Sequence, residues 1–328
     1  CSFQRPSGRS TAAWGLLDAF NRVRAQHHLR SQERGLYRQS GEPVTTCWRY
    51  AFDMSRSITL FSFGYWGWGN ATRQLVRAVD AVEESRGYEP PLFVDIRIRR
   101  EGRAKGFVGE AFARTVGEDR YEWMWGLGNQ SVVDHTSGIR IADPAQALDL
   151  LDRAIEASAR RQRVLYFCSC PYPINDFGPC HRTVVAELVL DAAKRQGRAA
   201  EVIEWPGDEP RSHDLRVSPE VGRRLASGLL GAPGLKNIPL GEKLPAPEWL
   251  GLAWGSPVRV DTGSDPLVVL SGPAHYSSGR WRLPVIHVFE GTDAESAAIQ
   301  RASTRFRRER GYEAAQTPAV GVNGQARR

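Results

Sequence analysis

The stretch VLYFCSCPYPINDFGPCHR, residues 164–182, joins a buried strand to the first turn of a helix through a loop rich in proline and cysteine. Its first five residues are apolar and mostly β-branched or aromatic, which is typical of a strand buried on both faces. We expect the helix that follows to run from about His181 to Gln196 and to end at Gly197. A buried strand that leads into such a helix is the unit from which parallel sheets are built.

The same alternation of apolar strands and amphipathic helices extends over residues 57–205. We expect strands at 58–63, 92–96, 164–168 and 202–205, a helix capped by Asn70 that ends near Arg86, and a helix capped by Asp143 with Leu148, Leu151 and Ile155 on its buried face. Between residues 97 and 120 we expect a basic loop and a short helix. This order predicts the fold class α/β, a Rossmann-like parallel sheet with flanking helices.

The segments outside this α/β domain have other patterns. We expect an N-terminal helix at 11–30 and a connector within 1–56, a linker rich in proline and glycine at 206–250 with a helix near 220–230, a small β-rich unit with a basic terminal helix at 251–312, and a disordered tail at 313–328. Short strands of the β-rich unit are expected at 258–260, 267–270 and 283–288, and its helix at 293–310.

Composition limits the class of protein. The chain of 328 residues has a formal net charge of +7. It contains no apolar run of the roughly 18 residues that a membrane span requires, so we expect no membrane contact. Five cysteines, an odd number, argue against a secreted disulfide scaffold and favour a cytoplasmic protein. Most basic residues are arginine, which suits phosphate and makes a nucleic acid or a nucleotide a candidate partner, although genome composition can produce the same bias.

Reactive and polar residues gather where the predicted strands end. In an open parallel sheet, ligands bind outside the carboxyl ends of the strands. The residues that follow the first three strands are Gly64, Tyr65 and Trp66, then Asp95 and Arg97, then Cys168 and Cys170, with Cys180, His181 and Arg182 across the loop. These side chains are expected to line one cleft.

Cys180, His181 and Arg182 stand where a helix begins, and three roles stay open for them. The helix dipole, Arg182 and a protonated His181 would lower the pKa of Cys180 and make it a nucleophilic thiolate. The same three residues would also suit a bound phosphate. A capping or packing role requires no ligand at all.

Metal binding is a further alternative for the cysteines. Cys168, Cys170, Cys180 and His181 supply four soft or borderline ligands. Their spacing, C-x-C-x9-C-H, is not one of the common zinc patterns, and adjacent Cys and His ligands are awkward for a tetrahedral site. We therefore expect no metal and no cofactor, with these four as the candidates should a metal bind.

Other residues near the cleft have two interpretations each. Asp95 would act as a general base or nucleophile, or would orient Arg97 in a plain ion pair. The basic loop contains Arg97, Arg99, Arg100, Arg103 and Lys105, and it would close over a phosphorylated ligand or lie in solvent. The aromatic turn around Trp66 would stack a base or sugar, or pack in the core.

Four motifs in this order resemble the domain-of-unknown-function-488 family of small bacterial and archaeal α/β proteins. They are Phe63-Gly64-Tyr65, Asp95-Ile96-Arg97, Leu127-Gly128-Asn129, and Leu165-Tyr166-Phe167-Cys168 with Cys180-His181-Arg182. The resemblance covers residues 57–205. The chain departs from it at Tyr65, where the family has His, at Cys170, where an acidic residue is common, and at Asn129, where the family has a second Gly. The family implies no settled activity.

These observations predict an enzyme that acts on a phosphate-bearing nucleotide or nucleic acid by a hydrolytic or N-glycosidic step. The expected catalytic residues are Asp95, Cys180 and His181, and the expected substrate-binding residues are Gly64, Tyr65, Trp66, Arg97, Asn129 and Arg182. One alternative is a rhodanese-like or phosphatase-like cysteine enzyme. Another is a non-catalytic module that binds nucleic acid. The sequence gives no indication of the oligomeric state.

Overall fold

The computed structural model describes residues 57–207, 213–230, 237–263, 267–290, 296–313 and 315–316. All of them belong to the second of two compact units, which spans 53–328. The helix and connector expected before residue 57 lie outside the described residues, as does most of the tail expected at 313–328. The expectation of disorder is wrong for Ala315–Gln316, which form a strand. Within the described part of the chain, no helix has both the length and the apolar character needed to cross a membrane.

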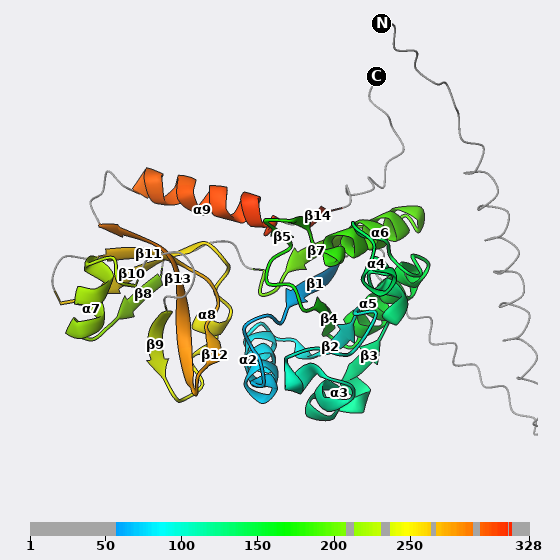
Figure 1. Ribbon diagram of the computed structural model, residues 1–328, viewed down its shortest axis with the longest axis horizontal. Coiled ribbons are helices and arrows are strands. Elements are labelled where there is room, and N and C mark those ends of the chain that lie inside the picture. Colours follow the sequence, from blue (N-terminus) through cyan, green and yellow to red (C-terminus); the bar gives the residue numbers. More distant parts are fainter. Residues whose placement is uncertain are drawn as a thin grey trace, which may run out of the picture. The chain divides into compact units, whose positions relative to one another are not determined.

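A six-stranded sheet forms the centre of the α/β part, in the order β14-β7-β1-β4-β2-β3 (Figure 1). Its strands are β1 (Ile58–Gly64), β2 (Glu89–Asp95), β3 (Tyr121–Trp123), β4 (Gln162–Cys168), β7 (Ala200–Glu204) and β14 (Ala315–Gln316). Neighbouring strands from β7 to β3 are parallel, and only the two-residue edge strand β14 pairs antiparallel, with β7. The predicted parallel α/β fold is confirmed.

Helices cover both faces of this sheet. They are α2 (Thr72–Ser85) and α3 (Ala111–Val116) on one face, and α5 (Gln146–Ala159) and α6 (His181–Arg195) on the other. Because side chains alternate along a strand, Phe61 and Phe93 pack towards α2 and α3, whereas Leu60 and Val94 pack towards α5 and α6. Burial on both faces explains why the strands read as continuous apolar runs.

Short elements connect these parts. They are the 3-10 helices η1 (Lys105–Phe107), η2 (Glu118–Arg120) and η3 (Trp125–Leu127), the helix α4 (Ser131–Asp134), and the two-stranded hairpin of β5 (Ile174–Asn175) and β6 (Gly178–Pro179). The hairpin lies in the loop between Cys170 and Cys180, so both of its ends are anchored near the carboxyl end of β4.

The neighbouring strands β1 and β4 lead to helices on opposite faces of the sheet. The chain passes from β1 to α2 on one face and from β4 to α6 on the other. Such a reversal leaves a crevice outside the carboxyl ends of the two strands, which is the usual ligand position in this architecture. Gly64 and Cys168 are register partners at this edge, and Ser62 pairs with Glu204 of β7.

Two details of the helix predictions are wrong. The N-cap of α2 is Ala71 rather than Asn70, and no side chain caps this helix. Leu148 is 40% exposed, because the buried face of α5 is centred on Leu150 and Leu151. Asp143 lies two residues before Ala145, the N-cap of α5, and accepts a hydrogen bond from the Ala145 amide at 3.1 Å.

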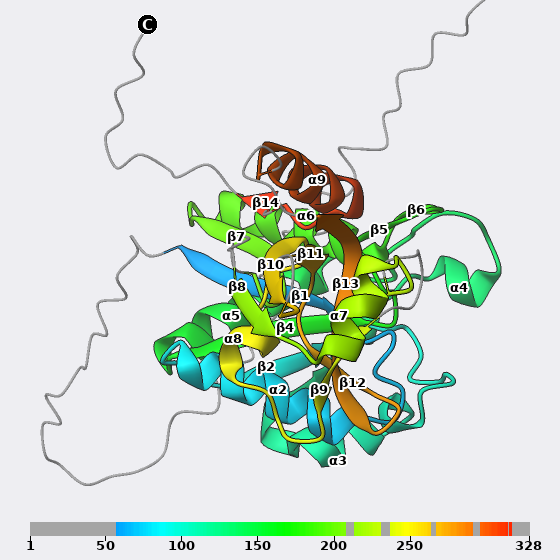
Figure 2. The same ribbon diagram turned by 90° about the vertical axis from the view of Figure 1, so that its left-hand side faces the viewer.

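A second sheet follows the α/β part (Figure 2). Its strands are β8 (His213–Arg216), β9 (Asn237–Gly241), β10 (Ser256–Asp261), β11 (Leu267–Ser271), β12 (His275–Ser277) and β13 (Arg280–Glu290), and its helices are α7 (Pro219–Ala226), α8 (Pro247–Leu250) and α9 (Ser296–Arg310). The order is β12-β13-β11-β10-β8, with β9 paired to β13. The predicted β-rich unit with a terminal helix is confirmed, and residues from the stretch expected as a linker contribute β8, β9, α7 and α8.

Candidate metal centre

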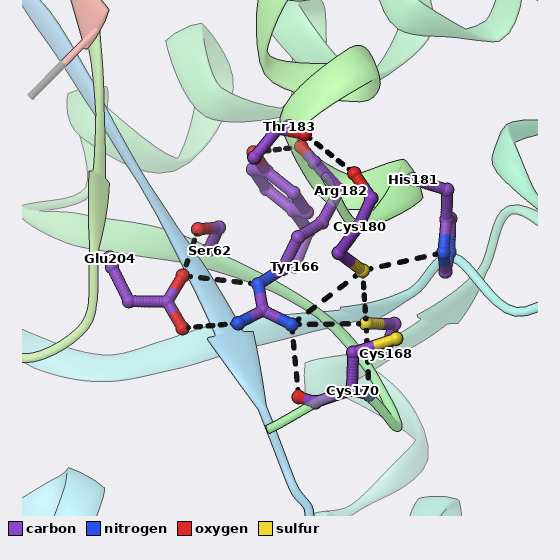
Figure 3. A network of polar contacts seen from close by, with 9 residues as sticks. All are labelled: Ser62, Tyr166, Cys168, Cys170, Cys180, His181, Arg182, Thr183 and Glu204. Carbon is purple, nitrogen blue, oxygen red and sulfur yellow. Dashed lines mark hydrogen bonds and ion pairs between the residues drawn. The ribbon is translucent and has the colours of Figure 1, made fainter. Parts of the chain in front are cut away.

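Three cysteines and one histidine converge at the carboxyl edge of the parallel sheet (Figure 3). Cys168 is the last residue of β4, and Cys170 lies two residues further along the loop. Cys180 is the N-cap of α6 and His181 is its first residue. The three sulfurs and a ring nitrogen of His181 all lie within 4.8 Å of one another.

The spacing of these atoms matches that of ligands around one metal ion. The Cys168 and Cys180 sulfurs are 3.3 Å apart, and the Cys180 sulfur lies 3.7 Å from His181 Nδ1. Thiolates bound to zinc at about 2.3 Å in a tetrahedron lie about 3.8 Å from one another. The adjacent Cys and His of the sequence therefore reach the same small volume, although their spacing looked unfavourable for a tetrahedral site.

His181 presents the correct nitrogen to the sulfurs. Its Nε2 lies 3.3 Å from the backbone carbonyl oxygen of Ile96, the residue after β2. A carbonyl oxygen only accepts hydrogen bonds, so in the neutral ring the proton is on Nε2 and the lone pair of Nδ1 is on the side of the sulfurs. A backbone carbonyl that fixes the unbound ring nitrogen in this way is characteristic of metal-binding histidines.

Arg182 connects the sulfurs to a buried carboxylate. Its side chain is fully buried, and it donates two hydrogen bonds to Glu204, at 2.9 and 3.2 Å. The remaining guanidinium nitrogen, Nη1, donates to the Cys168 sulfur at 3.3 Å and to the Cys170 carbonyl at 3.0 Å. Ser62 also donates to Glu204, at the oxygen Oε2 that accepts from Arg182 Nε. Arg182 therefore brings a positive charge to the sulfurs, and Glu204 holds it in place.

The cysteines differ in their tendency to ionise. Burial raises the pKa of Cys168, but hydrogen bonds from Cys170 and Cys180, with the charge of Arg182, outweigh burial and bring that pKa well below its usual value. Cys170 and Cys180 each form a hydrogen bond with Cys168. This bond raises the pKa of Cys170 to about 11, and the corresponding bond raises the pKa of Cys180. Of the three thiols, Cys168 is therefore the one whose ionisation the site favours, whereas the sequence suggested a thiolate at Cys180.

Gly64 allows the loop to approach the end of β1. A Cβ atom at this position would lie 1.9 Å from the Cys170 carbonyl oxygen and 3.0 Å from Arg182 Nη1. Both atoms belong to the hydrogen bond that ties Arg182 to the loop. Gly64 was expected to bind substrate, and the structure places it against the backbone of the cysteine loop instead.

Asp95 and Arg97 form a closed network beside the cysteines. Asp95 is fully buried and accepts from Arg97 at 2.8 and 2.5 Å and from Tyr121 at 3.0 Å. Arg97 also donates to the Tyr65 hydroxyl at 3.0 Å and to the Phe107 carbonyl at 2.8 Å. The structure therefore brings Asp95, Arg97 and Tyr65 together as the sequence predicted, but as an ion pair with satisfied hydrogen bonds.

Two further predicted site residues take other positions. Asn129 holds its own loop together, because its side chain accepts from the amides of Ser131 and Arg140 and donates to the Gly138 carbonyl. Trp66 is 66% exposed in the turn after β1, and no ring contact of this side chain is recorded among the described residues.

The sequence interpretation missed Glu204, Ser62 and Tyr166. Ser62 and Glu204 lie side by side on β1 and β7, and the Tyr166 hydroxyl donates to the Arg182 carbonyl at 3.1 Å. Glu204 could have been found from the sequence, because a carboxylate at the carboxyl end of an apolar strand is expected to be buried and to need a partner. Arg182, one helix earlier, is such a partner.

Comparisons of the chain with protein-family models, with curated proteins and with solved structures each found no match. The resemblance to the domain-of-unknown-function-488 family therefore stays a prediction that rests on its four sequence motifs.

Proposed function

We propose that this chain is a zinc-binding α/β protein, with Cys168, Cys170, Cys180 and His181 as ligands. One observation carries the proposal: three sulfurs and a histidine nitrogen lie within 4.8 Å of one another at the carboxyl edge of the sheet. The orientation of His181 by Ile96 and the Arg182 hydrogen bond to sulfur support it. Thiolate-rich sets with one imidazole select zinc or a similarly soft ion over magnesium or calcium.

A set of three cysteines and one histidine is a complete tetrahedral shell, which is typical of structural zinc sites. Bound zinc would fix the cysteine loop, residues 169–179, between β4 and α6. This loop supports the end of α9, since Asp176 pairs with Arg310 at 3.1 Å and Tyr172 packs edge-on against Tyr312. The proposed role of the metal is thus to hold the loop on which α9 rests.

The metal content of the purified full chain tests this proposal. We expect one zinc ion per chain by inductively coupled plasma mass spectrometry. Cys170→Ser removes one ligand, and we expect zinc affinity to fall by more than the roughly 10- to 100-fold that loss of an outer-shell partner causes. Cys170 is the suitable ligand to replace because it is only half-buried, so the variant leaves the core packing in place.

Cys47→Ser is the matched control, because it removes a thiol from another part of the chain. This variant should keep the zinc content of the wild type. A folded wild type that takes up no zinc, or a Cys170→Ser variant that binds zinc as tightly as the wild type, would contradict the proposal.

The distance between Cys168 and Cys180 supports a second candidate, a dithiol that cycles to a disulfide. Their sulfurs are 3.3 Å apart, and a two-electron oxidant, such as a second disulfide, that takes two electrons and two protons from the thiols would join them at about 2.05 Å. Mass spectrometry of the purified chain distinguishes the two candidates, because a Cys168–Cys180 disulfide in a zinc-free protein favours the dithiol. Bound zinc, with no disulfide among Cys168, Cys170 and Cys180, favours the metal centre.

Activity on a phosphate-bearing nucleotide or nucleic acid stays a prediction. The two arginines expected to hold phosphate, Arg97 and Arg182, are buried and bonded to Asp95 and Glu204. Any phosphate would therefore have to be held by other cations of the chain.

A further inference from the structure

We propose that a hollow between α2 and α3 binds a small phosphorylated molecule through Arg73, Arg77 and Arg114. This inference goes beyond the zinc centre and does not rest on it. The hollow has a volume of about 610 Å³ and is lined by Arg73, Val76, Arg77, Ala111, Arg114 and Thr115. Sites for small ligands typically measure roughly 300–1,000 Å³.

The side chains of the three arginines of the hollow are exposed. No side-chain hydrogen bond or ion pair joins any of the three to another described residue. Two of the carboxylates nearby in the sequence already have partners, because Asp80 on α2 pairs with Arg120 and Glu110 before α3 pairs with Arg100. The positive charge of the hollow is therefore left for a ligand.

The positions of these arginines destabilise α2 when no anion is present. Arg73 and Arg77 are four residues apart on α2, where like charges repel. Arg73 is also the second residue of α2, at the end where the helix dipole disfavours a cation, and the first turn contains no acidic residue. Arg114 adds a third charge from the opposite helix. An anion bound in the hollow would offset the charges of all three arginines.

The chemistry of the lining indicates the class of ligand. Guanidinium groups form paired hydrogen bonds with phosphate oxygens, and three of them suit one or two phosphate groups. Between the arginines, Val76 and Ala111 give the hollow an apolar surface on which a base or sugar ring can pack. A concave site of this size favours a small phosphate ester, such as a nucleoside diphosphate, over a nucleic-acid duplex.

Isothermal titration calorimetry of the full chain with ADP and with inorganic pyrophosphate, at about 50 mM salt, tests the proposal. We expect both to bind, and Arg77→Ala with Arg114→Ala to weaken binding at least about tenfold. The matched control is Arg223→Ala with Arg224→Ala, two exposed arginines of α7, which should leave binding unchanged. Circular dichroism melting of both double variants checks that the fold is intact.

Three results would overturn the proposal. The first is that neither ADP nor pyrophosphate binds. The second is that they bind the Arg77→Ala, Arg114→Ala protein as tightly as the wild type. The third is that a single-stranded oligonucleotide binds while the two small ligands do not, since that would place the contact on an extended surface rather than in the hollow.

Discussion

Replacement of Glu204 by alanine is expected to lower the free energy of unfolding by about 3–5 kcal/mol. The substitution leaves the guanidinium of Arg182 fully buried without its carboxylate, and an uncompensated buried charge is strongly destabilising. Ser62 also loses the acceptor of its hydrogen bond. Urea denaturation followed by tryptophan fluorescence measures the difference.

Two control variants separate the charge from the loss of packing. Glu201→Ala changes the same strand, where the carboxylate is only half-buried and accepts from neutral Thr59, so we expect a loss of about 1 kcal/mol. Glu204→Gln keeps the shape and removes the charge, and it should lose most of what Glu204→Ala loses. If Glu204→Ala lowers the free energy of unfolding no more than Glu201→Ala does, Glu204 does not stabilise the buried charge of Arg182.

Replacement of Gly64 by alanine is expected to weaken zinc binding roughly 10- to 100-fold, as the loss of outer-shell support does in other metal sites. The added methyl group would lie 1.9 Å from the Cys170 carbonyl oxygen, a backbone atom that cannot rotate away. The cysteine loop therefore has to move, and it takes the Cys170 sulfur and the Arg182 hydrogen bond with it. Competition with a fluorescent zinc chelator measures the change in affinity.

Gly102→Ala is the matched control for this substitution. Its nearest neighbour would be the Tyr65 hydroxyl at 3.9 Å, an ordinary contact, and Gly102 has no left-handed backbone conformation. The control should bind zinc as the wild type does. Wild-type affinity in the Gly64→Ala variant would show that the loop is not held against β1.

Strands buried on both faces were the easiest elements to predict from the sequence. The cores of β1, β2, β4 and β7 were predicted at 58–63, 92–96, 164–168 and 202–205, because a continuous apolar run has few other interpretations. The strands missed were short or polar. The three-residue β3 and the exposed β8 carry too little apolar periodicity to be distinguished from loops.

The sequence predicted which residues meet at the site, but not how close their side chains lie. The rule for carboxyl ends of parallel strands selected Cys168, Cys170, Cys180 and His181 as neighbours. The spacing of these residues along the chain argued against a metal. Spacing alone does not show that the hairpin of β5 and β6 folds the loop back, which brings the Cys180 sulfur to 3.3 Å from the Cys168 sulfur. The roles predicted for Arg97 and Arg182 depended on their being free, and Asp95 and Glu204 engage them.

X-ray absorption spectroscopy at the zinc edge tests the central claim most directly, because it identifies the ligand atoms around the bound ion. For the purified full chain, we predict three sulfur ligands at about 2.3 Å and one nitrogen ligand at about 2.0–2.1 Å. A zinc ion surrounded only by nitrogen and oxygen would contradict the assignment of Cys168, Cys170, Cys180 and His181.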